Sequence, residues 1–462
     1  MANFTLAEVA AAVGGERLMG EEDLVLSSFA IDSRLVRGSE LFFALRGPRH
    51  DGHDFLAGAF ARGAAAAVVS RADAASVVPP GRACIRVEDT TRALQELAAK
   101  LRRRRPLRVA GITGSSGKTT TKELAAAALS SVWRVHRSPG NLNNAYGLPL
   151  ALLSMPDDAE AAVLEMGMST PGEMTRLTEI ADPDVGAILN VGEAHRANFP
   201  SVEAIAEAKG EMFKEMRRDA TAVFNSSDPH ARRLGLSFPG RRVCFGVETG
   251  ADVAVTGVRD DMVEGVRFSF THAGSKPRPV ALQLYGRHNA ANAAAALAVS
   301  VAFDLDPTRA VEKIETVAPL KGRGAVLRLA QGVVLVDETY NSNPAAMQAV
   351  LASLTATRWA GRRVLACGDM LELGESASLW HREVGAMAAR AGVNFLLAVG
   401  PLARETATGA REAGLEEVVV FAGSEEAAGS AGTLLRPGDL VVVKGSRGIA
   451  MEIFADAVRE MF

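Results

Sequence analysis

The 462-residue sequence has few cysteines, few aromatic residues and no long hydrophobic run. Its three cysteines, Cys84, Cys244 and Cys367, lie far apart and form no Cys-x-x-Cys pair. This pattern argues against a disulfide framework or a zinc site and suits a reducing compartment. Aromatic residues make up only 5% of the chain, so Ala, Val and Leu must build the cores within a hydrophobic content of 48%. That content is ample for about three domains of the usual size.

The sequence also lacks a strong charge and a targeting segment. A net charge of -3 gives no electrostatic reason to expect a nucleic acid or an anionic membrane as partner. Residues 1–18 show no basic region followed by an apolar core, so no signal peptide is predicted. The most apolar helical segment, residues 289–303, is rich in alanine and too short to span a bilayer. We therefore expect a cytoplasmic protein without membrane insertion.

A phosphate-binding loop is the clearest motif. Residues 111–123 read GITGSSGKTTTKE, between an apolar strand at residues 109–112 and a helix that begins at Lys118. Gly114 and Gly117 allow the backbone N–H groups to converge at the positive end of that helix. In this interpretation Lys118 reaches the terminal phosphates and Thr119 offers its hydroxyl to Mg²⁺. Ile112 stands where the strict pattern has its first glycine, and the alternative is a glycine-rich turn without a ligand. The motif predicts a nucleoside triphosphate site.

The first hundred residues mix short strands and helices. They end in a helix with apolar residues at helical spacing: Leu94, Leu97, Ala98 and Leu101. The basic run 102–105 then meets Pro106, which predicts a solvated helix end and a domain boundary. From about Leu107, apolar strands alternate with helices in the rhythm of a largely parallel sheet. The interval 241–285 is expected to be antiparallel, and the helix 289–303 is expected to help close this domain.

The last third repeats the rhythm with five nearly all-apolar strands, as expected when helices cover both faces of a sheet. Asp337, Asp369 and Lys444 come at the ends of three of these strands, where open α/β sheets bind ligands. Asp also forms ordinary turns, so each alone is weak evidence. The sequence thus predicts an α/β protein of three domains, at residues 1–105, 106–316 and 317–462.

Three further polar residues lie in or near the central domain. Glu165 ends an apolar strand, where a carboxylate would suit Mg²⁺. His195 lies in a loop and Lys209 on a helix, and by default both side chains would be solvated. None of the three identifies a reaction by itself.

The order of motifs is more informative. The segments TGSSGKTT, GNLNNAYGLPL, LEMGMS, NVGEAH, AKGEMF, GRHNAANAAAA, LKGRG, DETYNSNPAAM, GDMLELG and VKGSRG follow one another along the chain. This series closely resembles the Mur ligase family, over essentially the whole sequence. The N-terminal IDSRLVRGSELFFALRGPRHDGHDF is shared in form with the member that adds the third residue of the cell-wall peptide, but DETYNSNPAAM separates the two. The chain looks like the member that adds D-Ala-D-Ala.

The resemblance implies a fold and a reaction. It implies a mixed α/β domain that binds the UDP-muramoyl peptide, a central P-loop ATPase-like parallel sheet, and a Rossmann-like doubly wound C-terminal domain that binds D-Ala-D-Ala and part of ATP. ATP would phosphorylate the carboxylate of UDP-N-acetylmuramoyl-tripeptide, and the amine of D-Ala-D-Ala would attack the acyl phosphate. The protein mainly positions the reactants and neutralises charge. The product would be the UDP-muramoyl-pentapeptide precursor of peptidoglycan, made by a monomeric enzyme.

The resemblance also implies residue roles. The triphosphate would contact Gly114, Ser115, Ser116, Gly117, Lys118, Thr119 and Thr120. Two magnesium ions would be held by Thr119, Glu165, His195 and Lys209, the last as a carbamate. Asn289 and Asn292 would lie near the adenine, on which Tyr340 would pack. Arg323 would lie near the γ-phosphate, and Asp337 would contact the ribose. The UDP-sugar and peptide would face Asp32, Ser33, Arg34, Arg46, Gly47, Asn141, Asn143 and Asn144. D-Ala-D-Ala would be held by Asn341, Asn343, Lys444 and Arg447.

One segment departs from the family pattern. The loop after the histidine usually has an acidic residue and glycines, but here it reads HRANFPS. Other interpretations are a third-residue-adding ligase, a folylpolyglutamate-synthetase-like ligase, a P-loop ATPase without ligation, and a catalytically inactive binding protein. The intact Lys118, Glu165 and Lys209 argue against the last of these.

Overall fold

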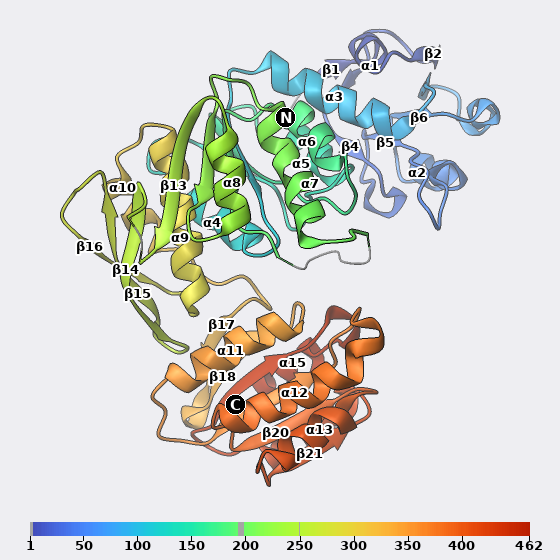
Figure 1. Cartoon of the computed structure of the whole chain (residues 1–462). Helices are drawn as coiled ribbons and strands as arrows, with labels where there is room; N and C mark the ends of the chain where they lie inside the picture. Colours follow the sequence, from blue (N-terminus) through green and yellow to red (C-terminus); the bar gives the residue numbers. More distant parts are fainter. Residues whose placement is uncertain (1–2, 193–197, 249) are drawn as a thin grey trace. The chain divides into compact units, whose positions relative to one another are not determined.

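The computed structural model describes residues 3–192, 198–248 and 250–462 (Figure 1). The chain divides into two compact units. One comprises Met1–Ala254, Thr271–Ser275 and Ala291–Ile314. The other comprises Val255–Phe270, Lys276–Ala290 and Glu315–Phe462. Among the described helices, none combines the length and apolar character needed to cross a bilayer.

The N-terminal region is a mixed five-stranded sheet in the order β2-β7-β6-β5-β4, whose strands β4 to β7 are parallel. Strands β1 and β3 form a separate antiparallel pair. The strands are β1 (Phe4–Thr5), β2 (Glu16–Met19), β3 (Val25–Leu26), β4 (Phe29–Ala30), β5 (Leu41–Phe43), β6 (Ala66–Val69) and β7 (Ala83–Arg86). The helices are α1 (Leu6–Val13), α2 (Leu56–Ala61) and α3 (Thr90–Arg104), with 3-10 turns η1 (Ser33–Leu35), η2 (Gly52–Phe55) and η3 (Ala72–Val77).

The central region contains a nine-stranded sheet in the order β16-β15-β14-β13-β12-β11-β8-β10-β9. Its strands are β8 (Arg108–Thr113), β9 (Val135–Arg137), β10 (Ala161–Glu165), β11 (Val185–Ile188), β12 (Thr221–Asn225), β13 (Arg241–Val247), β14 (Val253–Asp261), β15 (Gly265–His272) and β16 (Arg278–Leu282). The helices are α4 (Lys118–Leu129), α5 (Gly147–Leu153), α6 (Glu173–Ala181), α7 (Val202–Glu215), α8 (Pro229–Ser237), α9 (Arg287–Ala302) and α10 (Pro307–Ile314).

The antiparallel interval expected at residues 241–285 is only partly correct. Strands β15 and β16 pair antiparallel, as predicted. However, β13 pairs parallel with β12. The reason is that helix α8 connects β12 to β13, and such a crossover returns the chain in the same direction.

A second correction concerns the basic run after Leu101. Helix α3 begins at its N-cap Asp89 and ends before Pro106, as expected, but Arg102 is buried rather than solvated. Its guanidinium donates to the carbonyl oxygens of Ala181 and Asp182, at 3.0 and 2.8 Å. The apolar face of α3 belongs to one continuous core with the N-terminal sheet and the central sheet. The end of α3 is therefore a packed junction inside one compact unit.

The C-terminal region is a six-stranded sheet in the order β17-β18-β22-β19-β20-β21. All neighbours are parallel except the edge strand β17. The strands are β17 (Ala325–Arg328), β18 (Val334–Glu338), β19 (Arg363–Gly368), β20 (Phe395–Val399), β21 (Val418–Phe421) and β22 (Leu440–Lys444). The helices are α11 (Pro344–Ala356), α12 (Ala377–Arg390), α13 (Ala403–Glu412), α14 (Ser424–Leu434) and α15 (Glu452–Met461), with 3-10 turns η4 (Ala330–Gly332), η5 (Gly374–Ser376) and η6 (Arg447–Ile449).

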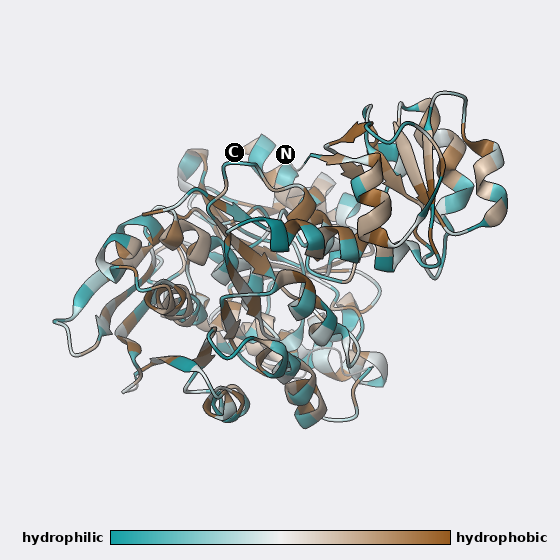
Figure 2. Ribbon diagram, turned by 90° about the horizontal axis from the view of Figure 1, so that it is seen from above, coloured by the Kyte–Doolittle hydropathy of each residue, from teal (hydrophilic) through white to brown (hydrophobic). Residues whose placement is uncertain are grey.

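Alternate residues of these strands enter two separate cores. Val334 and Val336 pack with helices α11 to α13, whereas Leu335 packs with helices α14 and α15. The strands are apolar on both faces for this reason. Figure 2 colours the whole chain by hydropathy, with apolar residues in brown. The sheet is therefore doubly wound, as the sequence predicted.

Candidate active site

The predicted phosphate loop connects β8 to α4. Gly114 has no room for a side chain, because a Cβ there would lie 2.9 Å from the Cβ of Leu189. Gly117 has φ +80°, and a Cβ there would lie 2.4 Å from Oδ1 of Asn292. The Nζ of Lys118 donates to the carbonyl oxygen of Gly114 at 2.7 Å, so the lysine folds back over the loop. The two glycines allow the closed turn that a phosphate cradle needs.

Hydroxyl groups of the loop contact the end of β11. Ser115 Oγ accepts from the N–H of Gly192 at 2.9 Å, and the N–H of Ser116 donates to Asn190 Oδ1 at 2.9 Å. Thr119 is buried in the first turn of α4, and Thr120 is half-buried beside it. The loop is thus supported from its own sheet, and the predicted residues 114–120 lie together.

Glu165 is the last residue of β10 and pairs in register with Ile112 of β8, next to the phosphate loop. Its N–H donates to Ser138 Oγ at 3.1 Å, and Asn143 Nδ2 donates to its Oε1 at 2.8 Å. The second carboxylate oxygen, Oε2, is buried without a hydrogen-bond partner. A buried acceptor that lacks a partner is costly unless a ligand satisfies it, so Glu165 fits a cation.

Lys209 lies on helix α7, and the default expectation of a solvated side chain is wrong because only 2% of the residue is exposed. Met212, three residues further on, packs close to Gly111 and Gly186 of the sheet, which places this face of α7 against β8 and β11. Burial, together with the positive charge of Lys118, lowers the pKa of Lys209 to about 7. Much of its population is therefore neutral near pH 7.

His195, the fourth predicted metal ligand, lies outside the described residues. In residues 3–192, 198–248 and 250–462, no three His, Cys, Asp or Glu side chains converge as a metal site. A magnesium ion at Glu165 would therefore depend on other oxygen atoms, such as the hydroxyl of Thr119 and the phosphates of the nucleotide.

Asn289 and Asn292 are buried three residues apart on helix α9. Asn289 Nδ2 donates to the carbonyl oxygen of Tyr285 at 2.6 Å. Asn292 Oδ1 accepts from Thr121 Oγ1 at 3.3 Å and abuts Gly117. Asn292 therefore belongs to the wall of the phosphate loop.

At the C-terminal sheet, Asp337 lies within β18 rather than after it, and it is fully paired. Its Oδ1 accepts from Thr339 Oγ1 at 2.6 Å, and its Oδ2 accepts from Arg459 Nη2 at 2.5 Å. The N–H of Gly322 also donates to Oδ2 at 3.3 Å. Any ribose contact of this carboxylate would have to share or replace those bonds.

The four residues predicted to hold D-Ala-D-Ala lie at the neighbouring ends of β18 and β22. Lys444 is buried, and its Nζ donates to Glu338 Oε2 at 3.1 Å and to the carbonyl oxygen of Asn341 at 2.9 Å. Asn343 caps helix α11, and both Asn343 and Arg447 are exposed. Two cations and several amide groups thus face one strand edge, a composition suited to an amide and a carboxylate.

Tyr340 lies between two arginines of this edge. The guanidinium carbon of Arg323 lies 3.8 Å from the centre of the Tyr340 ring, and that of Arg447 lies 5.6 Å from it. The ring therefore brings together the residue predicted for the γ-phosphate and one predicted for the dipeptide.

The residues predicted for the UDP-sugar are in two exposed turns. The Arg34 guanidinium donates to both oxygens of Asp32, at 2.9 and 2.7 Å, and holds the pKa of that carboxyl below its usual value. Ser33 follows in η1, Arg46 lies 3.5 Å from Asp51, and the N–H of Gly47 donates to the His50 carbonyl. In the loop after β9, Asn141 and Asn144 are exposed, and Asn144 Oδ1 accepts from the N–H of Gly147, the first residue of α5, at 2.9 Å.

Comparison with known proteins agrees with this geometry. Family models described as Mur ligase family catalytic domain, Mur ligase middle domain, and Mur ligase glutamate ligase domain match residues 26–102, 112–300 and 322–447. A UDP-N-acetylmuramoyl-tripeptide–D-alanyl-D-alanine ligase of Bacillus subtilis is 33% identical over 432 residues, which cover 93% of each chain. The chain belongs to the Mur ligase family. It is accordingly an ATP-dependent enzyme that forms amide bonds.

Solved structures show the same fold along the whole of this Mur ligase. A crystal structure of MurF from Acinetobacter baumannii has a TM-score of 0.91 and 29% identity, covering 100% of this chain and 99% of that one. MurF ligase from Thermotoga maritima, solved in complex with ADP, has a TM-score of 0.80 and 30% identity, covering 95% and 99%. The three predicted domain types are therefore correct.

Sequence reasoning missed the polar groups that support the site of this Mur ligase. Ser446 is buried and joins three strand ends. Its Oγ donates to the carbonyl oxygen of Ser342 and accepts from the N–H of Leu371. Its N–H donates to the carbonyl oxygen of Asp369. Tyr285 donates to Glu338 at 2.7 Å. Their partners are distant in sequence, so the sequence carried no signal for them.

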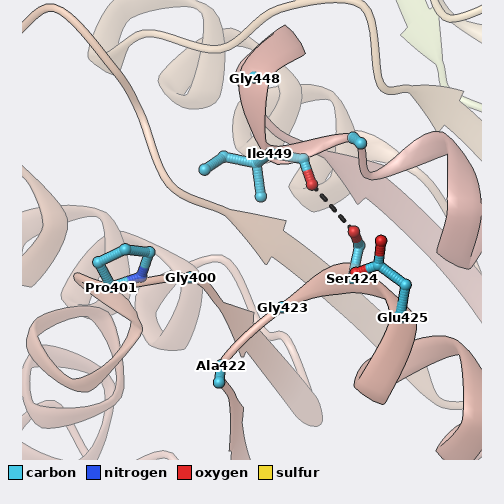
Figure 3. A pocket seen from close by; sticks show the side chains of 9 residues that line it. Gly400, Pro401, Ala422, Gly423, Ser424, Glu425, Gly448 and Ile449 are labelled. Atoms are coloured by element: carbon cyan, nitrogen blue, oxygen red, sulfur yellow. Dashed lines mark hydrogen bonds between the residues drawn. The ribbon is translucent and has the colours of Figure 1, made fainter.

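A small cavity of about 230 Å³ lies at the carboxyl ends of β20 and β21 (Figure 3). Gly400, Pro401, Gly423 and Glu425 are among its lining residues. The hydroxyl of Ser424 is already used as a donor within the protein, because it donates to the carbonyl oxygen of Ile449 at 3.0 Å. The cavity contains none of the predicted site residues.

Proposed function

We propose that this Mur ligase joins D-Ala-D-Ala to UDP-N-acetylmuramoyl-tripeptide through an acyl phosphate. The observation that carries the proposal is that the phosphate loop and the unpaired Glu165 Oε2 lie together, at the ends of β8 and β10. The charge of Lys118 in this loop also contributes to the lowered pKa of the buried Lys209. Such a site can hold a metal-bound triphosphate against a second anion. The relatives named D-alanyl-D-alanine ligase match 93% and 100% of the chain.

The reaction needs charge to be neutralised where two anions meet. A carboxylate is a poor electrophile, and transfer of the γ-phosphoryl group to it creates a good leaving group for attack by an amine. Lys118 and Arg323 would offset the phosphate charge, and the loop N–H groups would orient the phosphate oxygens. Bound Mg²⁺, at two sites, would supply further charge neutralisation, held by Thr119, Glu165, His195 and Lys209.

Lys209 would serve the metal as a carbamate. At a pKa of about 7 its amine is largely neutral above that pH. The neutral amine nitrogen can then bond to the carbon of CO₂ and release one proton, which converts the amine into a carbamate whose single negative charge is shared by two oxygens. Such hard oxygens suit magnesium, which an ammonium group cannot bind.

The other predicted residues take the substrates. The N-terminal turns with Asp32, Ser33, Arg34, Arg46 and Gly47, and the loop with Asn141, Asn143 and Asn144, would bind the UDP-sugar and its peptide. Asn289, Asn292, Asp337 and Tyr340 would bind the nucleoside of ATP. Asn341, Asn343, Lys444 and Arg447 would hold the dipeptide by its amide and carboxylate. We place the enzyme in the cytoplasm as a monomer, where it would complete the pentapeptide precursor of peptidoglycan.

The test is phosphate release with UDP-muramoyl tripeptides, with and without D-Ala-D-Ala, and with the product identified by mass spectrometry. We expect release and a pentapeptide product only when both substrates are present. Equal use of single D-Ala would contradict the dipeptide site, because a missing hydrogen-bonding group should leave buried partners unpaired. ATP turnover without any acceptor would indicate an ATPase instead, and addition of an amino acid to a dipeptide precursor would indicate the third-residue-adding reaction.

A further inference from the structure

Lys122 is a buried lysine that the proposed reaction does not use. It lies on α4, one turn after Lys118, and only 1% of the residue is exposed. Its Nζ donates to the carbonyl oxygens of Ser138 and Gly140, at 2.8 and 3.2 Å, and lies 3.2 Å from Glu123 Oε1. Lysine is almost never fully buried unless it is paired, so these contacts explain its place.

Both carbonyl oxygens belong to the chain segment that leaves β9 and runs towards Asn143. At the start of this segment, the N–H of Ser138 donates to the carbonyl oxygen of Val163 at 3.1 Å. The hydroxyl of Ser138 accepts from the N–H of Glu165. The segment thus begins with a direct contact to the strand end that carries the unpaired carboxylate oxygen.

The same segment ends on Glu165 as well. Asn143 Nδ2 donates to Glu165 Oε1, and the carbonyl oxygen of Asn143 accepts from the N–H of Gly167 at 2.7 Å. Helix α4 therefore contacts, through Lys122, the loop that orients the Glu165 carboxylate. Lys118 and Thr119 lie on that same helix, so Lys122 adds a side-chain link between the phosphate side and the carboxylate side of the site, beside the direct pairing of β8 with β10.

We propose that Lys122 is a positioning residue that fixes Glu165 relative to the phosphate loop for magnesium–nucleotide binding. This inference rests on the proposed function, since it takes Glu165 as a magnesium ligand. An apolar side chain of similar length could fill the same space, but it could not bind two carbonyl oxygens. Losing the ammonium group would release residues 138–143, and the orientation of Glu165 would be lost with them.

The experiment measures nucleotide binding rather than ligation. A fluorescent ATP analogue is titrated into the full chain at increasing Mg²⁺, and the half-saturating Mg²⁺ concentration is compared between wild type and Lys122→Met. We expect this concentration to rise about tenfold, as is typical when a partner of a metal ligand is removed. Nucleotide affinity measured in EDTA should change less than about twofold, because Lys118 and the loop remain. Lys122→Arg, which keeps a charged donor, should recover most of the loss.

Lys214→Met is the matched control, because Lys214 lies on α7 with its side chain 60% exposed. If Lys122→Met does not fold, Ser138→Ala is the test, since it removes only the hydroxyl that accepts from the N–H of Glu165. A smaller rise in the half-saturating Mg²⁺ concentration of this variant supports the proposal. An unchanged magnesium requirement in folded Lys122→Met, or in Ser138→Ala where only that variant folds, overturns it. Failure of wild type to ligate, with normal magnesium-dependent nucleotide binding, would count against the proposed function alone.

Discussion

Two buried lysines show how differently the central and C-terminal regions treat charge. Lys209 and Lys444 are 2% and 3% exposed. The ammonium group of Lys444 pairs with Glu338 and with a backbone carbonyl. For Lys209, burial and the nearby charge of Lys118 instead lower the pKa to about 7. Equal burial thus yields a paired cation in one region and a partly neutral amine in the other.

The carboxylates follow the same division. Glu165 keeps a buried oxygen without a partner, whereas both oxygens of Asp337 are paired within the C-terminal region. Unsatisfied polar atoms are costly in a folded protein and tend to mark places where a ligand completes the structure. The unpaired oxygen of Glu165 supports the proposal of a metal and phosphate site in the central region, whereas the paired Asp337 holds its own strand end in place.

The largest effect is expected from the phosphate loop. Lys118→Ala should lower the ligation rate by about 10²–10³ or more, because one preorganised electrostatic contact to the transition state is typically worth that much. The measurement is phosphate release under saturating substrates with a purified, folded variant. Near-normal turnover would show that the phosphate loop does not take part in the reaction. It would also contradict the contrast between the central region and the C-terminal region.

Lys209→Ala should be almost inactive, and short carboxylic acids such as acetate should partly restore turnover by supplying the missing oxygens. Wild-type activity should also fall in buffer freed of CO₂ and return with bicarbonate. The control is Lys214→Ala on the same helix, which should behave as wild type. Full activity of Lys209→Ala would contradict the carbamate.

Removing each buried lysine should change stability in opposite directions. Lys444→Met removes the buried cation that pairs with the half-buried Glu338, which should destabilise the fold by about 3 kcal/mol. Lys209→Met should instead stabilise it by about 2–4 kcal/mol at pH 7 in CO₂-free buffer, since each pKa unit corresponds to about 1.4 kcal/mol. The measurement is urea unfolding of both variants beside wild type.

The pH dependence tests the sign of the Lys209 effect. The unfolded lysine binds its proton below its ordinary pKa of 10.5, whereas the folded one does so only below about 7. The Lys209 contribution to stability is therefore most favourable above pH 10.5, declines as the pH falls from 10.5 to about 7, and is constant below that. This slope should be absent in Lys209→Met. Equal destabilisation by Lys209→Met and Lys444→Met would contradict the claim that the two buried lysines differ in charge compensation.

The smallest effect is expected at the strand ends of the C-terminal region. Ser446→Ala should raise KM for D-Ala-D-Ala about tenfold, because losing a buried hydrogen bond costs about 1–3 kcal/mol. KM for the UDP-tripeptide should stay unchanged, since Ser446 joins loops of the C-terminal region through Ser342, Asp369 and Leu371. An equal rise in both KM values, together with a lower melting temperature, would indicate a merely structural role for Ser446.

Much of the fold could be predicted because its signals are local. Apolar runs identified the parallel strands, and the glycines of the phosphate loop marked a turn that no other residue could form. The alternation of strand residues between two cores required no knowledge of distant contacts. Even the position of Glu165 at a strand end followed from the run before it.

What the sequence determined by itself was therefore the order of elements, the phosphate loop and the family resemblance, since each depends on neighbours along the chain. Only the tertiary structure decided which charges are compensated. It buried Lys209 with no counter-ion among the residues that the structure describes, and it joined Lys122 to a loop sixteen residues away. It also paired Arg102 with carbonyls about eighty residues away and gave Asp337 and Lys444 their partners. The physical reason is that the energy of a charge depends on burial and on nearby opposite charge, and both are set by segments that meet only when the chain folds.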